Sequence, residues 1–344
     1  MRRIFTIGLS IVLITLCIGC PLEGRLEPPS ITKTLTGMSL PAALSWIKDH
    51  AASNSEYTII IENNESLDPL NFSLKNKKNV TITIKSSNDN KIITLNSLGS
   101  LLTIESGITF ILEDNIEMRG RNDNNASLIT INSGGTLIIN GGIVGNNNGG
   151  KGYYNSYSGL YYEGGAGIFV SDGGKLIMQS GYVINNITPS GYRNNGGGVF
   201  IAGNGIFEMS GGFVSDNSVD YSHGYGCGDA VCVSSNGKFV LRGGIISHNG
   251  YGTRQYIPRG CVFVDEGGNF TMTGGEISGN DNRGVYSIGY FNKTGGIIYG
   301  ANANADKKNR DYAVYVSDGK KRTGTANESN NIDTSLNGQS GGWD

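Results

Sequence analysis

Apolar residues recur two positions apart in six consecutive units between residues 131 and 298, and all six units share one internal spacing. Each unit ends in a glycine pair or its near equivalent, and the second glycine serves as an anchor. The anchors are Gly142, Gly181, Gly212, Gly244, Gly275 and Gly296. A period of two is typical of strands with one buried face. The pattern therefore predicts six copies of a strand, a turn and a second strand.

Positions at a fixed distance from the anchors form columns, and each column carries mainly one kind of residue. Five residues before the anchor the side chain is large and apolar: Leu137, Leu176, Phe207, Phe239, Phe270 and Phe291. Three residues before stand Ile139, Met178, Met209, Leu241 and Met272, with Lys293 as the exception. Eleven residues before stand Ile131, Val170, Ile201, Val233, Val264 and Val285. Five residues after stand Asn147, Asn186, Asn217, Asn249 and Asn280, with Ala301 in the sixth unit.

Such short units bury an apolar face only by stacking on one another. Coils stacked about 4.8 Å apart turn each column into a ladder that lines a continuous interior. Glycine suits the corners, where the backbone needs a positive φ. Asparagine tolerates the left-handed conformation and hydrogen-bonds the same amide in the next coil, so we expect the asparagine column to be structural. The predicted fold class is all-β, a parallel β-helix (solenoid).

Four units are longer than one bare coil. The anchors at 275 and 296 are 21 residues apart, whereas those at 244 and 275 are 31 apart. The additional residues fall between the asparagine and the next strand in every unit. We call these segments the inserts: residues 148–167, 187–198, 218–230 and 250–261. We expect them to stack along one edge of the solenoid.

A helix is predicted at residues 37–56, where Leu40, Ala43, Leu44 and Ile47 lie on one face. Pro41 suits its first turn, and Ser39 or Leu40 the cap position. An open solenoid exposes a strand edge at its end, so the helix is expected to cap it. The solenoid is expected to span residues 57–316, and a polar tail residues 317–344.

The first residues carry export information. A short basic start and an apolar run from Ile4 to Ile18 match a signal peptide core and are too short for a membrane span. Gly19-Cys20 ends this run and resembles a bacterial lipoprotein signal, although Cys17 replaces the usual leucine three residues before Cys20. We predict a signal peptide at residues 1–19 and lipidation of Cys20. Residues 20–36 would tether the fold. An ordinary signal peptide without lipid is the alternative.

Composition narrows the classes of function. Glycine accounts for 54 of the 344 residues, in keeping with many corners. Only 16% of the residues are charged and the net charge is −2, so the sequence has no basic stripe of the kind that binds nucleic acid. No metal-ligand or cofactor motif appears, and we expect neither a metal nor a cofactor.

Three cysteines would remain unmodified after export: Cys227, Cys232 and Cys261. A disulfide from Cys227 to either Cys232 or Cys261 would leave one thiol free, and the alternative for Cys232 is an outer strand position.

Several segments resemble spirochaete-type lipoproteins with right-handed parallel β-helix repeats. They are residues 205–212, 268–280 and 291–296, Ala-Leu-Ser-Trp-Ile at 43–47 and the final Gly-Gly-Trp-Asp. The resemblance covers most of the chain. It implies a right-handed, single-stranded helix of the pectin-lyase-like fold, a lipid anchor and an envelope location. It implies no defined activity.

Catalysis is the alternative function, because many β-helices of this fold cleave polysaccharides. The galacturonan hydrolases of this fold carry Asn-Thr-Asp, Asp-Asp, His-Gly and Arg-x-Lys motifs in successive coils. Only the His-Gly motif has a counterpart in this sequence, His223-Gly224. We interpret Asp216, Asp220 and Asp229 as solvated loop residues. A polysaccharide lyase or hydrolase thus remains the second hypothesis, and a purely structural spacer the third.

The inserts carry ten of the 17 tyrosines amid glycine, serine and asparagine, a composition suited to recognition surfaces. The predicted binding residues are Tyr153, Tyr154, Tyr157, Tyr161, Tyr162, Tyr192, Tyr221, Tyr225, Tyr251, Tyr256, Arg193, Arg254 and Arg259. The alternative is that these rings pack the inserts together, and both roles are compatible. We expect a monomer, anchored in the bacterial outer membrane or at the cell surface, that binds a glycan or a protein.

Overall fold

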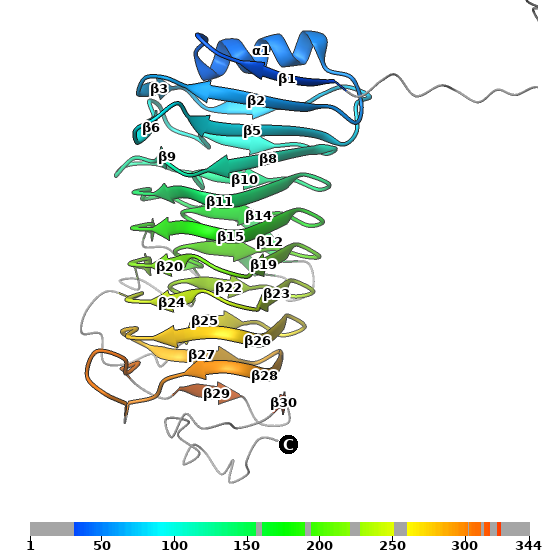
Figure 1. Ribbon diagram of the computed structural model, residues 1–344. Helices are drawn as coiled ribbons and strands as arrows, with labels where there is room; N and C mark the ends of the chain where they lie inside the picture. The colour runs from blue at the N-terminus through cyan, green and yellow to red at the C-terminus, as the bar shows by residue number, and fades with distance from the viewer. Residues whose placement is uncertain are drawn as a thin grey trace, which may run out of the picture.

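A computed structural model describes residues 31–155, 160–189, 194–220, 228–250, 260–301, 303–310, 313–316 and 322–324. The fold is a right-handed parallel β-helix with one short helix at its N-terminal end (Figure 1). Each coil contributes strands to three faces. Strands of neighbouring coils pair in parallel on all three, as the stacking of the repeat units predicted.

Two faces belong to one continuous sheet of 16 described strands that bends at the glycine pairs. The first face holds β1 (Thr32–Leu35), β2 (Glu56–Ile61), β5 (Val80–Ser86), β8 (Ile108–Glu113), β11 (Thr136–Gly145), β15 (Lys175–Ile184), β19 (Ile206–Met209), β23 (Lys238–Leu241), β26 (Asn269–Ser278), β28 (Tyr290–Ile298) and β30 (Arg322–Gly324). The second face holds β3 (Glu65–Leu67), β6 (Lys91–Leu95), β9 (Ile116–Arg119), β20 (Phe213–Ser215), β24 (Ile245–Ser247) and the second halves of β11, β15, β26 and β28.

The third face is a separate sheet of nine described strands, here the return sheet. It holds β4 (Leu70–Phe72), β7 (Leu102–Ile104), β10 (Ile129–Ile131), β14 (Ile168–Val170), β18 (Val199–Ile201), β22 (Val231–Val233), β25 (Gly260–Val264), β27 (Arg283–Ser287) and β29 (Val314–Val316). Short strands lie outside the three faces: β12 (Lys151–Asn155), β13 (Leu160–Gly164), β16 (Ile187–Thr188), β17 (Asn194–Asn195) and β21 (Ser218–Val219).

The predicted interior column is confirmed residue by residue. Leu176 pairs with Phe207, Phe207 with Phe239, and Phe239 with Phe270. The Phe207, Phe239 and Phe270 rings are completely buried and stack with centroids 4.8 Å apart, which is the spacing of the coils. Aromatic pairs in such stacks are more favourable than their buried area alone accounts for. The column therefore forms the continuous core of the solenoid.

Two of the predicted columns have an unexpected member in the sixth unit. Val264 pairs with Ser287 rather than with Val285, which instead pairs with Val262. The reason is a shorter corner, because two residues separate β27 from β28 and four separate β25 from β26. Lys293, in the column three residues before the anchor, breaks the apolar pattern and is nevertheless fully buried, where it pairs with Met272.

The anchor glycines occupy the bend between the first two faces. Gly181 has φ +88°, and a Cβ there would lie 2.2 Å from the carbonyl oxygen of Gly142. Both the left-handed backbone and the close approach of the neighbouring coil require glycine at this position.

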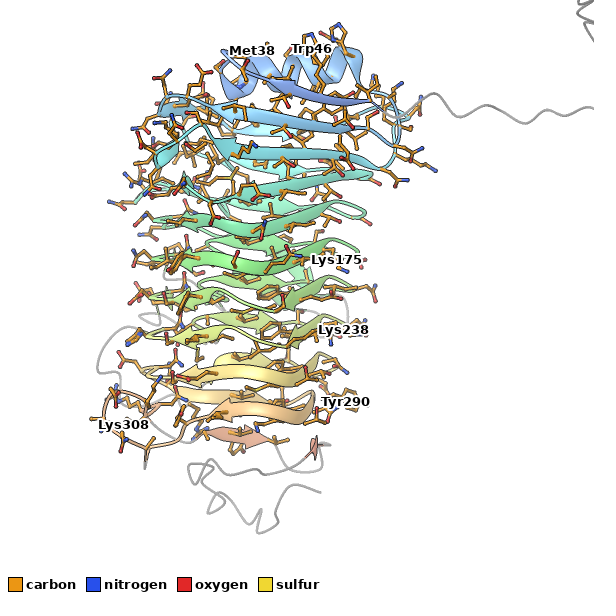
Figure 2. All side chains as sticks on the ribbon, in the orientation of Figure 1. Met38, Trp46, Lys175, Lys238, Tyr290 and Lys308 are labelled. Atoms are coloured by element: carbon orange, nitrogen blue, oxygen red, sulfur yellow. The ribbon has the colours of Figure 1, made fainter. Side chains whose placement is uncertain are left out.

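The N-terminal helix α1 (Leu40–His50) covers the first coil, as predicted, and buries Leu40, Ala43, Leu44 and Ile47. Pro41 lies in its first turn, but Ser39 makes no side-chain cap. Residues 32–35, at the end of the segment expected to be a tether, form β1 and pair with β2. Met38 and Trp46 lie on this capped end, in Figure 2.

Candidate functional site

An asparagine ladder fixes the point at which each insert leaves the solenoid. The amide Nδ2 of Asn186 donates to Oδ1 of Asn217 at 3.0 Å, and that of Asn217 donates to Asn249 at 3.1 Å. The backbone N–H of Asn217 also donates to Oδ1 of Asn249 at 3.0 Å. These amides are fully buried. Since buried polar groups are costly unless satisfied, the ladder holds consecutive coils in register.

The ladder continues beyond the residues that the spacing identified. At its N-terminal end Nδ2 of Asn124 donates to Oδ1 of Asn147 at 2.9 Å. At its C-terminal end Nδ2 of Asn280 donates to Oδ1 of Asn309 at 2.8 Å. The spacing places Ala301 at this position in the sixth unit, but the ladder continues at Asn309, because the chain makes a detour after β28 before it returns to the ladder.

A residue in the left-handed conformation precedes each of the five ladder asparagines from Asn147 to Asn280 and makes the sharp turn. These residues form the left-handed column: Asn146, Asn185, Asp216, His248 and Gly279. Their φ angles lie between +54° and +63°. Asn and Asp are enriched in this conformation, and glycine adopts it without strain. Asp216 is exposed, as predicted for a turn residue.

All four inserts return at one place. They lead into β14, β18, β22 and β25 of the return sheet, which lie side by side. The common departure at the ladder and the common return place the described ends of all four inserts at one edge of the solenoid, here called the insert edge.

The first two inserts are paired where the structure describes them. β12 and β13 form an antiparallel hairpin whose backbone register places Tyr153 opposite Tyr162 and Tyr154 opposite Tyr161. The second insert adds β17, which pairs with β13 in parallel. The remaining predicted residues lie outside the described part of the chain: Tyr157, Tyr192, Tyr221, Tyr225, Tyr251, Tyr256, Arg193, Arg254, Arg259, Cys20 and Cys227.

Asp229 was interpreted as a solvated loop residue, and the structure corrects this. Its carboxylate is fully buried at the end of the third insert. One oxygen accepts the backbone N–H of Val219 at 3.0 Å, and the other accepts Nδ2 of Asn282 at 2.7 Å. Asp229 therefore joins the two ends of its own insert and ties them to a later coil. Its neighbours along the sequence gave no sign of this role, because Asn282 is 53 residues away.

Cys261 lies beside Asp229, and burial, followed by the Asp229 carboxylate, raises the pKa of its thiol well above the ordinary value. A thiol that stays protonated is a poor nucleophile. Cys232 occupies an outward strand position, as predicted, in a buried column with Phe169, Phe200 and Phe263. The outer face of the return sheet is thus covered where the inserts arrive.

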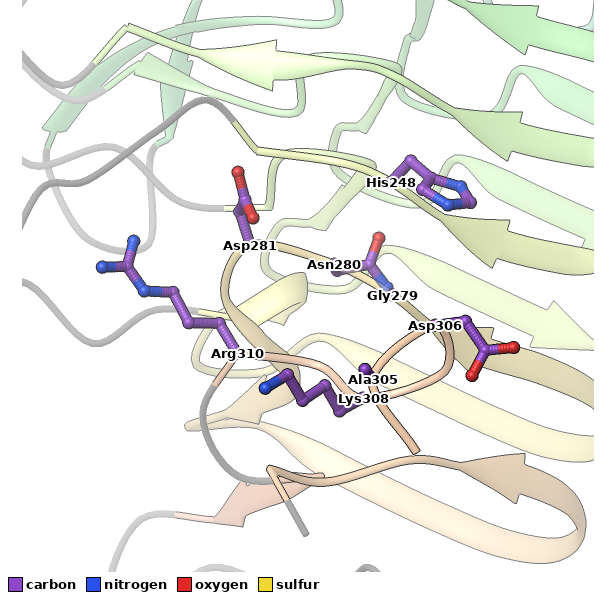
Figure 3. Close-up of a pocket in the computed structure, with 8 residues that line it drawn as sticks. All are labelled: His248, Gly279, Asn280, Asp281, Ala305, Asp306, Lys308 and Arg310. Atoms are coloured by element: carbon purple, nitrogen blue, oxygen red, sulfur yellow. The ribbon is translucent and has the colours of Figure 1, made fainter. Parts of the chain in front are cut away.

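A pocket of about 430 Å³ lies at the C-terminal end of the insert edge. Its lining residues come from three successive turns of the ladder: His248, Gly279, Asn280, Asp281, Ala305, Asp306, Lys308 and Arg310. Figure 3 shows Lys308, Arg310 and Asp281 on one side and His248 and Asp306 on the other. Sequence patterns missed this pocket, because the segment around residue 306 lies outside the repeat.

Among the described residues, no group of three or more His, Cys, Asp or Glu side chains is placed to hold a metal ion. No helix in the described ranges is long and apolar enough to cross a membrane. Comparison with known proteins finds no matching family model, no similar curated protein and no similar solved structure.

Proposed function

We propose that the protein is an envelope lipoprotein, anchored through Cys20, that binds a glycan or a protein of the host or envelope along its insert edge without catalysing a reaction. The observation that carries the proposal is the common departure and return of the four inserts. Segments fixed at both ends in consecutive coils present their side chains as one surface several coils long. Inserts on a rigid scaffold are where binding residues are commonly found.

The composition of the inserts supports recognition. Tyrosine offers a large contact area with a polar tip and loses little conformational entropy, and glycine, serine and asparagine add adaptable hydrogen bonding. The paired tyrosines of the β12–β13 hairpin bring four of these residues together along the backbone. The net charge of −2 argues against a partner held mainly by charge.

The test is a screen of the delipidated protein against a glycan array and host matrix proteins. It is followed by simultaneous replacement of Tyr192, Tyr225 and Tyr256 by serine. We expect the binding found in the screen to be eliminated and the melting temperature to change little. The control is Tyr290→Ser, because Tyr290 is 57% exposed. In Figure 2 it lies on the lateral edge opposite the pocket residue Lys308.

Two results contradict the proposal. A fall of many degrees in the melting temperature of the triple variant would mean that the rings pack the inserts together. Cleavage of pectic polymers that disappears on replacing His223 or Arg259 would establish the alternative, a polysaccharide lyase or hydrolase of the pectin-lyase-like fold.

A further inference from the structure

The left-handed column changes at Gly279, which lines the pocket. The earlier members of the column all carry polar side chains, and Gly279 has none. A Cβ at Gly279 would lie 3.6 Å from Nε2 of His248 and 3.3 Å from the carbonyl oxygen of Asp306. Glycine therefore leaves open the space between the His248 ring and the segment around Asp306. No other coil has this segment, since it belongs to the detour that follows β28.

Hydrogen bonds within the protein hold the walls of the pocket in place. The backbone N–H of Gly279 donates to the carbonyl of Lys307 at 2.9 Å, and that of Arg310 donates to the carbonyl of Asn280 at 2.8 Å. The side-chain amide of Asn280 belongs to the ladder: its Nδ2 donates to the carbonyl of Ser278 at 3.0 Å and to Oδ1 of Asn309 at 2.8 Å. The pocket is thus largely formed before binding, which lowers the entropy cost of association.

Three side chains around the pocket have uncommitted polar groups. Those of His248, Asp306 and Lys308 are exposed, and none makes a hydrogen bond or ion pair within the part of the chain that the structure describes. The neighbouring Lys307 differs, because its ammonium pairs with Glu276 at 2.7 Å. Figure 3 shows the Lys308 ammonium on one side of the pocket and the His248 ring and the Asp306 carboxylate on the other. Hydrogen-bond donors and an acceptor therefore border the pocket without a hydrogen-bond partner among the described residues.

The charges around the pocket balance. Lys308 and Arg310 oppose Asp281 and Asp306. An anionic ligand would meet two carboxylates, and a cationic ligand would meet an ammonium and a guanidinium. A hydroxyl group both donates and accepts a hydrogen bond, so a neutral polyhydroxylated ligand satisfies both kinds of partner. The volume of about 430 Å³ is within the range of small-molecule sites.

We infer that this pocket binds one neutral sugar residue through His248, Asp306 and Lys308. The inference rests on the proposed function only for the class of ligand, because the pocket residues named here include none of the insert tyrosines. A neutral ligand in a charge-balanced site should bind with little dependence on salt concentration.

The experiment uses the whole chain and a set of methyl hexopyranosides (glucoside, galactoside and mannoside), followed by NMR of the imidazole C–H signals. The protein has three histidines, and His248→Gln identifies the signal of His248. We expect at least one of the three glycosides to shift this signal saturably. Glycine serves as a zwitterionic probe and sodium acetate as an anionic one.

The decisive variant is Gly279→Asn. Asn146 and Asn185 already occupy this column at φ +59° and +55°, so asparagine suits the φ of +63° at Gly279. The new side chain would fill the pocket and should weaken binding by at least about tenfold. Asp216→Asn is the matched control, since it changes the same column two coils away. Lys308→Ala changes an exposed side chain, and it should also weaken binding.

Unchanged binding in both Gly279→Asn and Lys308→Ala would overturn the inference, as would a response to glycine or acetate but to none of the glycosides. The triple tyrosine variant separates this site from the insert edge. It should retain the His248 response even where it has lost binding on the array.

Discussion

The carboxylate of Glu65 lies at the N-terminus of α1, where its two oxygens accept the backbone N–H of Leu40 at 3.0 and 2.9 Å. Glu65 belongs to β3 in the coil beneath the helix, 25 residues along the chain. It supplies the capping acceptor that Ser39 does not. A carboxylate near a helix N-terminus is favourable because it satisfies a backbone donor and complements the helix dipole. The cap helix is therefore fastened to the solenoid at its first residue.

Replacing Glu65 by alanine should lower the free energy of unfolding by about 1 kcal/mol, the typical effect of a lost cap. Chemical denaturation followed by circular dichroism would measure it. The control is Glu62→Ala, since Glu62 accepts the exposed N–H of Gly37 and not a donor of the helix. Equal effects of the two replacements would mean that Glu65 does not fasten the helix.

Glu65 also predicts a pH dependence. Burial raises the pKa of Glu65 above its ordinary value, and the hydrogen bond from Leu40 partly opposes this. A raised pKa in the folded state favours folding below the unfolded pKa, and this contribution is lost as the pH rises through the folded pKa. The stability of Glu65→Gln relative to the unmodified protein should therefore increase as the pH rises from below 4.5 toward neutrality. A difference that is constant, or that moves the other way, would contradict the prediction.

Truncating Phe239 to alanine should cost about 3 to 5 kcal/mol, as buried aromatic truncations do. Its ring is stacked between those of Phe207 and Phe270 and has no exposed surface. Equilibrium denaturation is the measurement. Lys238→Ala, at the exposed position next to it, should change stability by no more than about 0.5 kcal/mol. A cost below about 1 kcal/mol for Phe239→Ala would place the column outside the core.

Asn217→Ala should destabilise the protein by at least about 3 kcal/mol, because it leaves several buried groups unsatisfied. The backbone N–H and Nδ2 of Asn186 lose their acceptor, and the carbonyls of Val183 and Ser215 lose a donor. Asp216→Asn at the adjacent exposed position is the control and should be nearly neutral. Thermal denaturation of the two variants side by side would decide, and similar melting temperatures would refute a structural ladder.

Cys20→Ser tests the anchor. If Cys20 is acylated after cleavage at Gly19, the replacement should abolish labelling with a radioactive fatty acid and release the protein from the membrane fraction. Cys227→Ser is the matched control, because Cys227 lies outside the signal peptide and its lipoprotein motif. A Cys20→Ser protein that stays in the membrane fraction to the same extent would exclude lipid anchoring through this residue.

The sequence by itself determined the solenoid and the register of its core. The spacing of Phe207, Phe239 and Phe270 from their anchor glycines was sufficient to pair them correctly, because a side-chain period of two leaves only one face for apolar residues. The asparagine ladder followed for the same reason as far as Asn280. The position of the inserts also followed, since their lengths do not disturb the columns on either side.

Only the tertiary structure decided the features that depend on contacts between segments of irregular length. Asn309 completes the ladder and Ser287 replaces Val285, because a detour and a shortened corner shift the spacing in the last coils. Asp229 is buried and Glu65 caps α1 through partners in other coils. The pocket at Gly279 is formed by the segment of that detour. Such contacts depend on where a connection places its residues in space, and no periodic pattern encodes that path.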